Sequence, residues 1–243
     1  NRWQEYVEEL FKDSRPQNPV TEFMQGPKIL KTEIESALKQ MSNGKAVGID
    51  NVSTETLQAL GKFGITYLTD ICNEMYSTAY IPEDLRTSIF IVLPKNPRAT
   101  ECSDHRTISL MCHTLKLLLI VILKRMSDKI NINVGPEQAG FRKDSGTREG
   151  IFNLRMLIEK YIENQKDIYA CFIYYSKAFD TVKHKELIES LQTTDVDEND
   201  IAVISNLYWQ QITKIRINDE LSAPVTIQRG VRQGCVLSPL LFN

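Results

Sequence analysis

The 243-residue sequence contains no apolar segment long enough to cross a membrane. Its longest apolar run covers residues 117–123 and lies between two lysines, whereas a spanning helix needs roughly 20 residues. The first stretch, NRWQEYVEEL, is too polar for a secretory signal peptide. We therefore expect an intracellular protein, cytoplasmic or nuclear, with no membrane partner, in which residues 117–123 belong to a buried helix.

Cysteine is scarce, and its spacing indicates neither a disulfide framework nor a zinc site. The five cysteines are an odd number, and no two of them have the CxxC spacing. The loop NGKAVGID lacks the first glycine and the Ser/Thr of a phosphate-binding P-loop. The three histidines are scattered, with no carboxylate at an interval typical of a hydrolase triad. These patterns favour reduced thiols and argue against those enzyme classes.

The chain as a whole also has no large excess of positive or negative charge, because its net charge is -2. The charge is nevertheless uneven. Residues 86–148 contain 11 Lys and Arg against 5 Asp and Glu, a net of +6 within an acidic chain. Such a basic segment is typical of a surface that faces a polyanion, although an ordinary solvated face is the alternative.

Apolar periodicity predicts a helix-rich α+β fold. Helical spacing opens the chain and recurs over 53–79, with a break near Gly61 or Gly64, and over 113–129, 146–164, 183–191 and 197–209. The predicted strands are 88–95, 106–110 and 168–175, and the segments KIRIND and APVTIQRG predict a hairpin. We expect the three strands to come together, with helix 113–129 packed against them.

Four segments in a fixed order carry the chemistry: IVLPK…CSDHRTISL, EQAGFRKDSGTREGIFNL, CFIYYSKAFDTVKH and GVRQGCVLSPLLFN. Together they resemble the reverse transcriptases of non-LTR (LINE-type) retrotransposons, which belong to endonuclease-reverse transcriptase polyproteins. The stretches RWQEYVEELF and NGKAVGIDNVSTETLQAL resemble what those proteins carry just before and into the polymerase. The resemblance covers nearly the whole chain. It implies a right-hand polymerase fold, of which this chain supplies the fingers and an incomplete palm.

The resemblance implies a division of the chain and a set of partners. Residues 1–30 would form an amphipathic helix and linker that precede the polymerase, and residues 31–165 a fingers-like region. Residues 166–243 would form a partial palm, truncated before the family's second metal-binding hairpin. The family acts on an RNA template and a DNA primer and uses Mg²⁺. The oligomeric state stays open.

The resemblance also implies substrate-binding roles for single residues. Lys95 and Arg106 match the fingers residues that hold the incoming triphosphate, and Arg142 matches an arginine of the template side or the fingers. Phe179 matches the bulky residue beneath the nucleotide sugar, which discriminates deoxyribose from ribose. Gln233 matches the residue beside the nascent base pair. Surface charge is the alternative for Lys95 and Arg106, and a core position is the alternative for Phe179.

Position 174 departs from the family. The family form is FIDYSKAFD, whose first Asp binds the catalytic ions, but Tyr174 stands there in this chain. A neutral phenol with a pKa near 10 is a poor ligand for Mg²⁺, which prefers carboxylates. The family's other carboxylates lie in an ADD hairpin, and no Asp-Asp dipeptide occurs in these 243 residues. Asp180 is not a family ligand and is expected to N-cap the next helix.

These departures predict a truncated copy of a reverse transcriptase that is catalytically inactive, with no metal site and no productive Mg²⁺ binding. The alternative is a non-enzymatic nucleic-acid-binding remnant that uses the basic segment 86–148. Such binding would depend steeply on salt and little on base sequence. A folded fragment with no activity is the third possibility.

Overall fold

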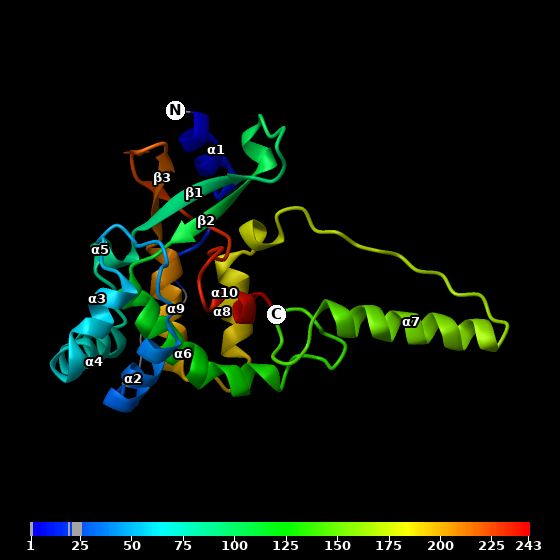
Figure 1. The fold of residues 1–243 in the computed structure, drawn as a ribbon, viewed down its shortest axis with the longest axis horizontal. Coiled ribbons are helices and arrows are strands. Elements are labelled where there is room, and N and C mark those ends of the chain that lie inside the picture. Colours follow the sequence, from blue (N-terminus) through cyan, green and yellow to red (C-terminus); the bar gives the residue numbers. More distant parts are fainter. Residues whose placement is uncertain (1, 19, 21–25) are drawn as a thin grey trace.

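The computed structural model describes residues 2–18, 20 and 26–243, and it combines helices with one mixed sheet. Figure 1 shows a body that holds the sheet and most of the helices, and a long arm that projects from it. The helices are α1 (Arg2–Leu10), α2 (Lys31–Gln40), α3 (Thr54–Ala59), α4 (Gly61–Thr78), α5 (Glu83–Arg86), α6 (His113–Asn131), α7 (Thr147–Glu163), α8 (His184–Gln192), α9 (Glu198–Trp209) and α10 (Ser238–Phe242). Two 3₁₀ turns, η1 (Cys102–Asp104) and η2 (Ala178–Thr181), accompany them. The predicted α+β class is confirmed.

The sheet has the strand order β2-β1-β3-β4, and β5 also pairs with β3. Its strands are β1 (Ser88–Pro94), β2 (His105–Leu110), β3 (Ile212–Ile217), β4 (Glu220–Leu221) and β5 (Val225–Thr226). β1 runs antiparallel to β2, with Pro94 opposite His105, and parallel to β3. Because β1 ends where β2 begins, Lys95 and Arg106 lie at the same end of the sheet. The predicted strands 88–95 and 106–110 and the predicted hairpin are confirmed.

Helix α1 covers one face of the sheet. Its Val7 and the following Phe11 are buried against Phe90 of β1, Ile215 of β3 and Val225 of β5. Side chains alternate between the two faces of a strand, so Phe90 and Ile215, which are opposite each other in the register, point to the same side. The amphipathic pattern of the N-terminal segment therefore serves to close a small core beneath the sheet.

Shortening the buried Val7 side chain should weaken the packing of α1 on the sheet. We expect Val7→Ala to lower the free energy of unfolding by about 1–2 kcal/mol, because a fully buried methyl pair is lost and a cavity remains. The control is Ile151→Ala on α7, since Ile151 is 66% exposed and its truncation should change stability by less than about 0.5 kcal/mol. Urea denaturation followed by circular dichroism measures both, and equal effects would contradict this packing.

A second, larger core lies among the helices. α6 runs through its centre, contacts α2, α4, α5 and α10, and buries both its apolar faces. Leu115, Leu118, Leu119 and Ile122 are fully buried, as a core helix requires, but they belong to this helical core and not to the cluster beneath the sheet. The main partners of α6 are therefore helices, and the expectation that it packs on the strands is wrong. Among the described helices, none is long and apolar enough to span a membrane.

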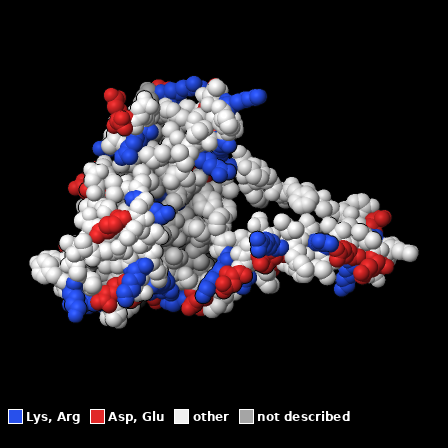
Figure 2. All heavy atoms as spheres, viewed as in Figure 1, with Lys and Arg blue, Asp and Glu red and all other residues white. Residues whose placement is uncertain are grey.

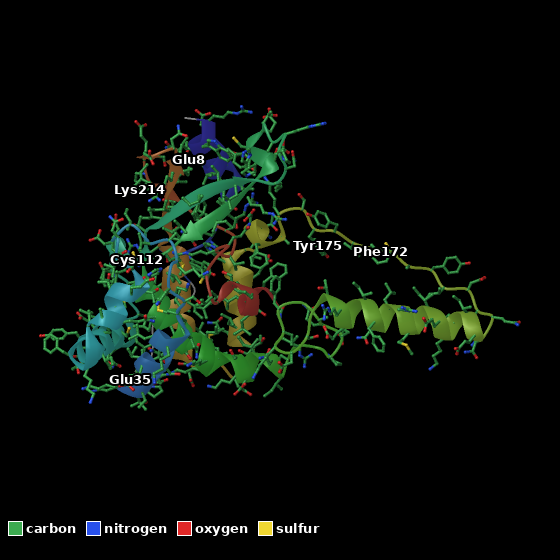
Figure 3. The ribbon with its side chains drawn as sticks, viewed as in Figure 1. Glu8, Glu35, Cys112, Phe172, Tyr175 and Lys214 are labelled. Atoms are coloured by element: carbon green, nitrogen blue, oxygen red, sulfur yellow. The ribbon has the colours of Figure 1, made fainter. Side chains whose placement is uncertain are left out.

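The arm consists of α7 and the extended segment that follows it (Figure 1). α7 has no buried residue. The predicted strand 168–175 is wrong, because this segment has no strand hydrogen bonding to any described residue. Phe172 is 82% exposed, and Figure 3 shows it on the extended segment, farther from the body than Tyr175. β-propensity alone does not make a strand, which needs a hydrogen-bonded neighbour and a surface on which to pack.

Candidate nucleotide-binding site

A cleft of about 810 Å³ opens at the end of the sheet where β1 stops and β2 begins. Four parts of the chain line it: the β1–β2 connection, the loop before α7, residues 174–180, and residues 233–239. Its volume lies in the range of roughly 300–1,000 Å³ typical of ligand sites. Figure 2 shows the hollow between the body and the arm, with Lys and Arg side chains at its upper rim.

The structure brings together most of the residues that the sequence proposed for substrate binding. Lys95, Arg106, Phe179 and Gln233 all line the cleft, and Tyr174 lines it too. Arg142 does not. Its guanidinium Nη1 donates a hydrogen bond to the Gly135 carbonyl at 2.9 Å, which folds it back onto its own loop.

The cleft carries positive charge at the strand ends. Lys95 is exposed, and its Nζ donates to the Ser103 carbonyl at 2.8 Å. In the described part of the chain, no hydrogen bond or ion pair engages the Arg106 guanidinium. Lys177 lines the opposite side of the same cleft. Three cations with unused donors around one cleft suit a ligand that carries several negative charges.

Asp180 lies at the back of the cleft and not at the start of a helix. It belongs to η2, is 6% exposed, and its Oδ1 accepts a hydrogen bond from Gln233 Nε2 at 2.7 Å. The expectation that Asp180 caps the next helix is wrong, because α8 begins only at His184. Burial raises the pKa of Asp180, while the hydrogen bond from Gln233 and the charges of Lys177 and Lys95 oppose that rise. The hydrogen bond holds the Gln233 side chain against Asp180 in the wall of the cleft.

An aromatic cluster forms the apolar side of the cleft. Phe179 stacks on Phe242, with ring centroids 4.6 Å apart and planes 17° apart. Phe141 meets Phe179 edge-on at 5.5 Å, so that its ring completes the cluster. The backbone holds Phe179 in place, because its carbonyl accepts from the Val231 amide at 2.8 Å. A planar, half-buried surface of this kind can pack against a flat ring or a sugar.

Two glycines let the 230–234 segment approach the cleft closely. Gly230 has φ +90° and Gly234 has φ +107°, both in the region that side chains rarely adopt. A Cβ on Gly234 would lie 3.0 Å from the Ser109 carbonyl, and one on Gly230 would lie 3.0 Å from the Asp180 carbonyl. The Ser109 amide donates to the Gln233 carbonyl at 2.7 Å. Gly234 thus allows this segment to lie directly against β2, and Gly230 allows it to lie directly against η2.

The residues present in the cleft do not fit Mg²⁺. Tyr174 is 91% exposed, and its phenol is a weak ligand for a hard cation. Asp180, which also lines the cleft, is buried and already bonded to Gln233. Within the described ranges, no cluster of three His, Cys, Asp or Glu side chains could hold a metal ion.

The profile of the family described as reverse transcriptase (RNA-dependent DNA polymerase) matches residues 93–243. The chain belongs to this family. Its relatives include the probable RNA-directed DNA polymerase from transposon BS of Drosophila melanogaster, 29% identical over 214 residues, which are 87% of this chain and 24% of that protein. The Pol polyprotein from the type-1 retrotransposable element R2 of Popillia japonica is 29% identical over 160 residues, 65% of this chain and 22% of that protein. The transposon TX1 149 kDa protein of Xenopus laevis is 25% identical over 211 residues, 87% of this chain and 16% of that protein.

These relatives confirm the resemblance to non-LTR retrotransposon reverse transcriptases. The family binds an RNA template and a DNA primer and generally uses Mg²⁺. The chain spans less than a quarter of the length of each of the three relatives named above.

Sequence reasoning did not propose three residues that the structure places in this cleft. Lys177, His105 and Phe141 line it together with the proposed residues. Lys177 could have been found, since it lies in the SKAFD stretch that the sequence singled out. His105 was set aside as one of three scattered histidines, because nothing in the sequence placed it beside the 174–180 loop.

Proposed function

We propose that this cleft is the deoxynucleoside triphosphate site of a non-LTR reverse transcriptase, with residues 31–165 as fingers and 166–243 as part of the palm. One observation supports it best: residues from segments far apart in sequence line the same cleft, namely Lys95, Arg106, Phe179 and Gln233. The cations would bind the triphosphate, Phe179 would lie under the sugar, and Gln233, held by Asp180, would face the base pair. Arg142 would support its own loop.

We further propose that these 243 residues do not catalyse nucleotide transfer. Transfer onto a 3′-hydroxyl needs two divalent ions held by carboxylates. Tyr174 occupies the position of the family's metal-binding Asp, and it is an exposed phenol beside the cleft. The chain would thus keep the shape of a substrate site and lack the ligands that make it reactive.

Nucleotide binding tests the site without requiring catalysis. We expect Arg106→Ala and Lys95→Ala each to weaken binding of a fluorescent deoxynucleoside triphosphate by about tenfold, because each removes a charge-assisted contact of roughly 1.5 kcal/mol. The matched control is Lys62→Ala on α4, an exposed lysine outside the cleft, which should leave the affinity unchanged. Fluorescence anisotropy at fixed ionic strength measures all four proteins.

Two results would contradict the nucleotide site. One is the absence of saturable binding by the wild-type chain. The other is an equal loss of affinity in the Lys62→Ala control, which would show that only the overall charge matters.

The second candidate function is nucleic-acid binding without catalysis. The basic segment does not act as one continuous stripe, because Arg125 is paired with Glu33 at 2.8 Å and Lys129 with Asp197 at 3.0 Å. Arg106 is without such a pair among the described residues, and it lies at the cleft. Filter binding of a primer–template at two salt concentrations distinguishes this candidate from an inert fragment, which would retain no nucleic acid at either.

A further inference from the structure

The N-terminal helix α1 reaches the rim of the cleft through its aromatic residues. The Lys177 ammonium donates a hydrogen bond to the Tyr6 hydroxyl and lies 4.6 Å from the centroid of the Tyr6 ring. Trp3 meets His105 edge-on at 5.0 Å and Tyr6 edge-on at 5.9 Å. Lys177 and His105 both line the cleft. One helix therefore contacts the walls of the cleft on the β2 side and on the 174–180 side.

The other end of α1 is held rigidly by the body. Val7 and Phe11 are buried in the core beneath the sheet. The Gln228 amide donates to the Phe11 carbonyl at 3.1 Å, and Arg229 Nε donates to the Leu10 carbonyl at 2.8 Å. Because these contacts fix the helix on the sheet, the Tyr6 ring is a fixed partner for the side chain that it touches.

The backbone at Lys177 has an uncommon conformation, and its side chain lies between Tyr6 and the cleft. Lys177 has φ +53°, a left-handed conformation that a residue with a side chain adopts only at a cost. Its side chain is half-buried between Tyr6 and the cleft. An ammonium group has three donors. One is used by Tyr6, so two remain for a ligand in the cleft.

We propose that α1 is a wall of the nucleotide cleft and that Tyr6 is a positioning residue, which holds the Lys177 ammonium where it binds the phosphates together with Lys95 and Arg106. This inference rests on the proposed function, because it requires that the cleft binds a nucleotide. It assigns to the segment before the polymerase a part in substrate binding. Cation–π contact and a hydrogen bond to the same ring restrict the ammonium to one place, so less freedom is lost when phosphate binds.

The test compares a deoxynucleoside triphosphate with the same deoxynucleoside lacking phosphates, each titrated against the full chain. We expect Tyr6→Leu to weaken triphosphate binding about five- to tenfold and to leave deoxynucleoside binding unchanged. Tyr6→Phe keeps the ring and should lose about two- to threefold. Glu9→Gln, on the exposed side of the same helix, is the matched control and should change neither affinity. Thermal unfolding of each variant identifies any loss of fold.

A double-mutant cycle separates positioning from a general structural effect. Lys177→Met should weaken triphosphate binding about tenfold, and adding Tyr6→Leu to it should cause no further loss, because Tyr6 acts only through Lys177. The proposal is overturned if the two losses multiply, if Tyr6→Leu binds the triphosphate as tightly as wild type or more tightly, or if both ligands are weakened equally. Absence of triphosphate binding by the wild-type chain would overturn the proposed function and this inference with it. Triphosphate binding by the wild-type chain with an affinity that Tyr6→Leu does not change would overturn this inference alone.

Discussion

Extension of a labelled DNA primer on an RNA template, with Mg²⁺ and deoxynucleotides, should give no product from the 243-residue polypeptide. Tyr174→Asp in the same polypeptide should also give none. That substitution restores one carboxylate to the cleft and removes an exposed ring. It does not supply the second set of ligands, and two ions cannot be positioned from one side. The transition-state charge on the phosphate would then face water, at a loss of at least ~10³-fold in rate.

Activity should return only when two changes are combined. The first is Tyr174→Asp, and the second is a segment with a family-type Asp-Asp hairpin joined after Asn243. The hairpin alone, with Tyr174 kept, is the matched control and should stay inactive. Template-dependent product from the unmodified polypeptide would contradict the proposed inactivity. Asp180, which lines the cleft, would then be the first residue to test as a metal ligand.

Two buried groups should make the stability of the fold respond to pH in opposite directions. His184 is 1% exposed. Its Nε2 donates to the Gly230 carbonyl at 2.9 Å, and its Nδ1 accepts from the Arg15 guanidinium at 3.1 Å. Burial lowers the pKa of His184, the hydrogen bond to Gly230 opposes this, and the charges of Arg15 and Arg232 add to the lowering, so that the pKa is about 4. As pH falls from 6.5 to 4, the unfolded chain binds the proton first. The free energy of unfolding should therefore fall, by about 3 kcal/mol from this group.

Asp200 on α9 should change the free energy of unfolding with pH in the opposite direction to His184. It is 1% exposed, and neither carboxylate oxygen has a hydrogen-bond partner among the described residues. Burial raises its pKa to about 6, while Tyr76 and the charge of Arg125 oppose the rise. The folded chain therefore binds this proton first. The free energy of unfolding from this group should fall as pH rises from about 4 to 6, by about 3 kcal/mol.

The two contributions should nearly cancel in the wild type and separate in single variants. Asp200→Asn should make stability increase steeply with pH between 4 and 6.5, and it should stabilise the chain at pH 7. His184→Gln should make stability decrease over the same window. Urea denaturation at pH 4, 5, 6 and 7 measures the three slopes. Identical slopes in all three proteins would show that these groups titrate normally in the fold.

Local pattern determined most of the helices and the paired strands of this protein. The 3.6-residue period predicted α4, α6, α8 and α9 to within a residue or two at most ends, because each buries one side or more in the core. α3 ends at Ala59 and α4 begins at Gly61, whose φ is +61°, as the break near Gly61 or Gly64 predicted. The β1–β2 pair was also predictable, because Pro94 stops one strand and a turn-rich connector leads into the next. Family motifs then named residues that line one cleft, although their roles stay predictions.

Tertiary structure decided what the neighbours of a segment are, and no local pattern contains that information. The stretch at 168–175 is apolar enough for a strand, but a strand forms only against a partner, and the described chain gives it none. Asp180 lies in a sequence that suits a helix cap, yet its carboxylate meets Gln233, 53 residues away. Likewise, only the packing of α1 on the sheet brings Tyr6 to Lys177. Sequence thus determined the elements and named the motif residues, whereas contacts between distant segments decided how the cleft is built.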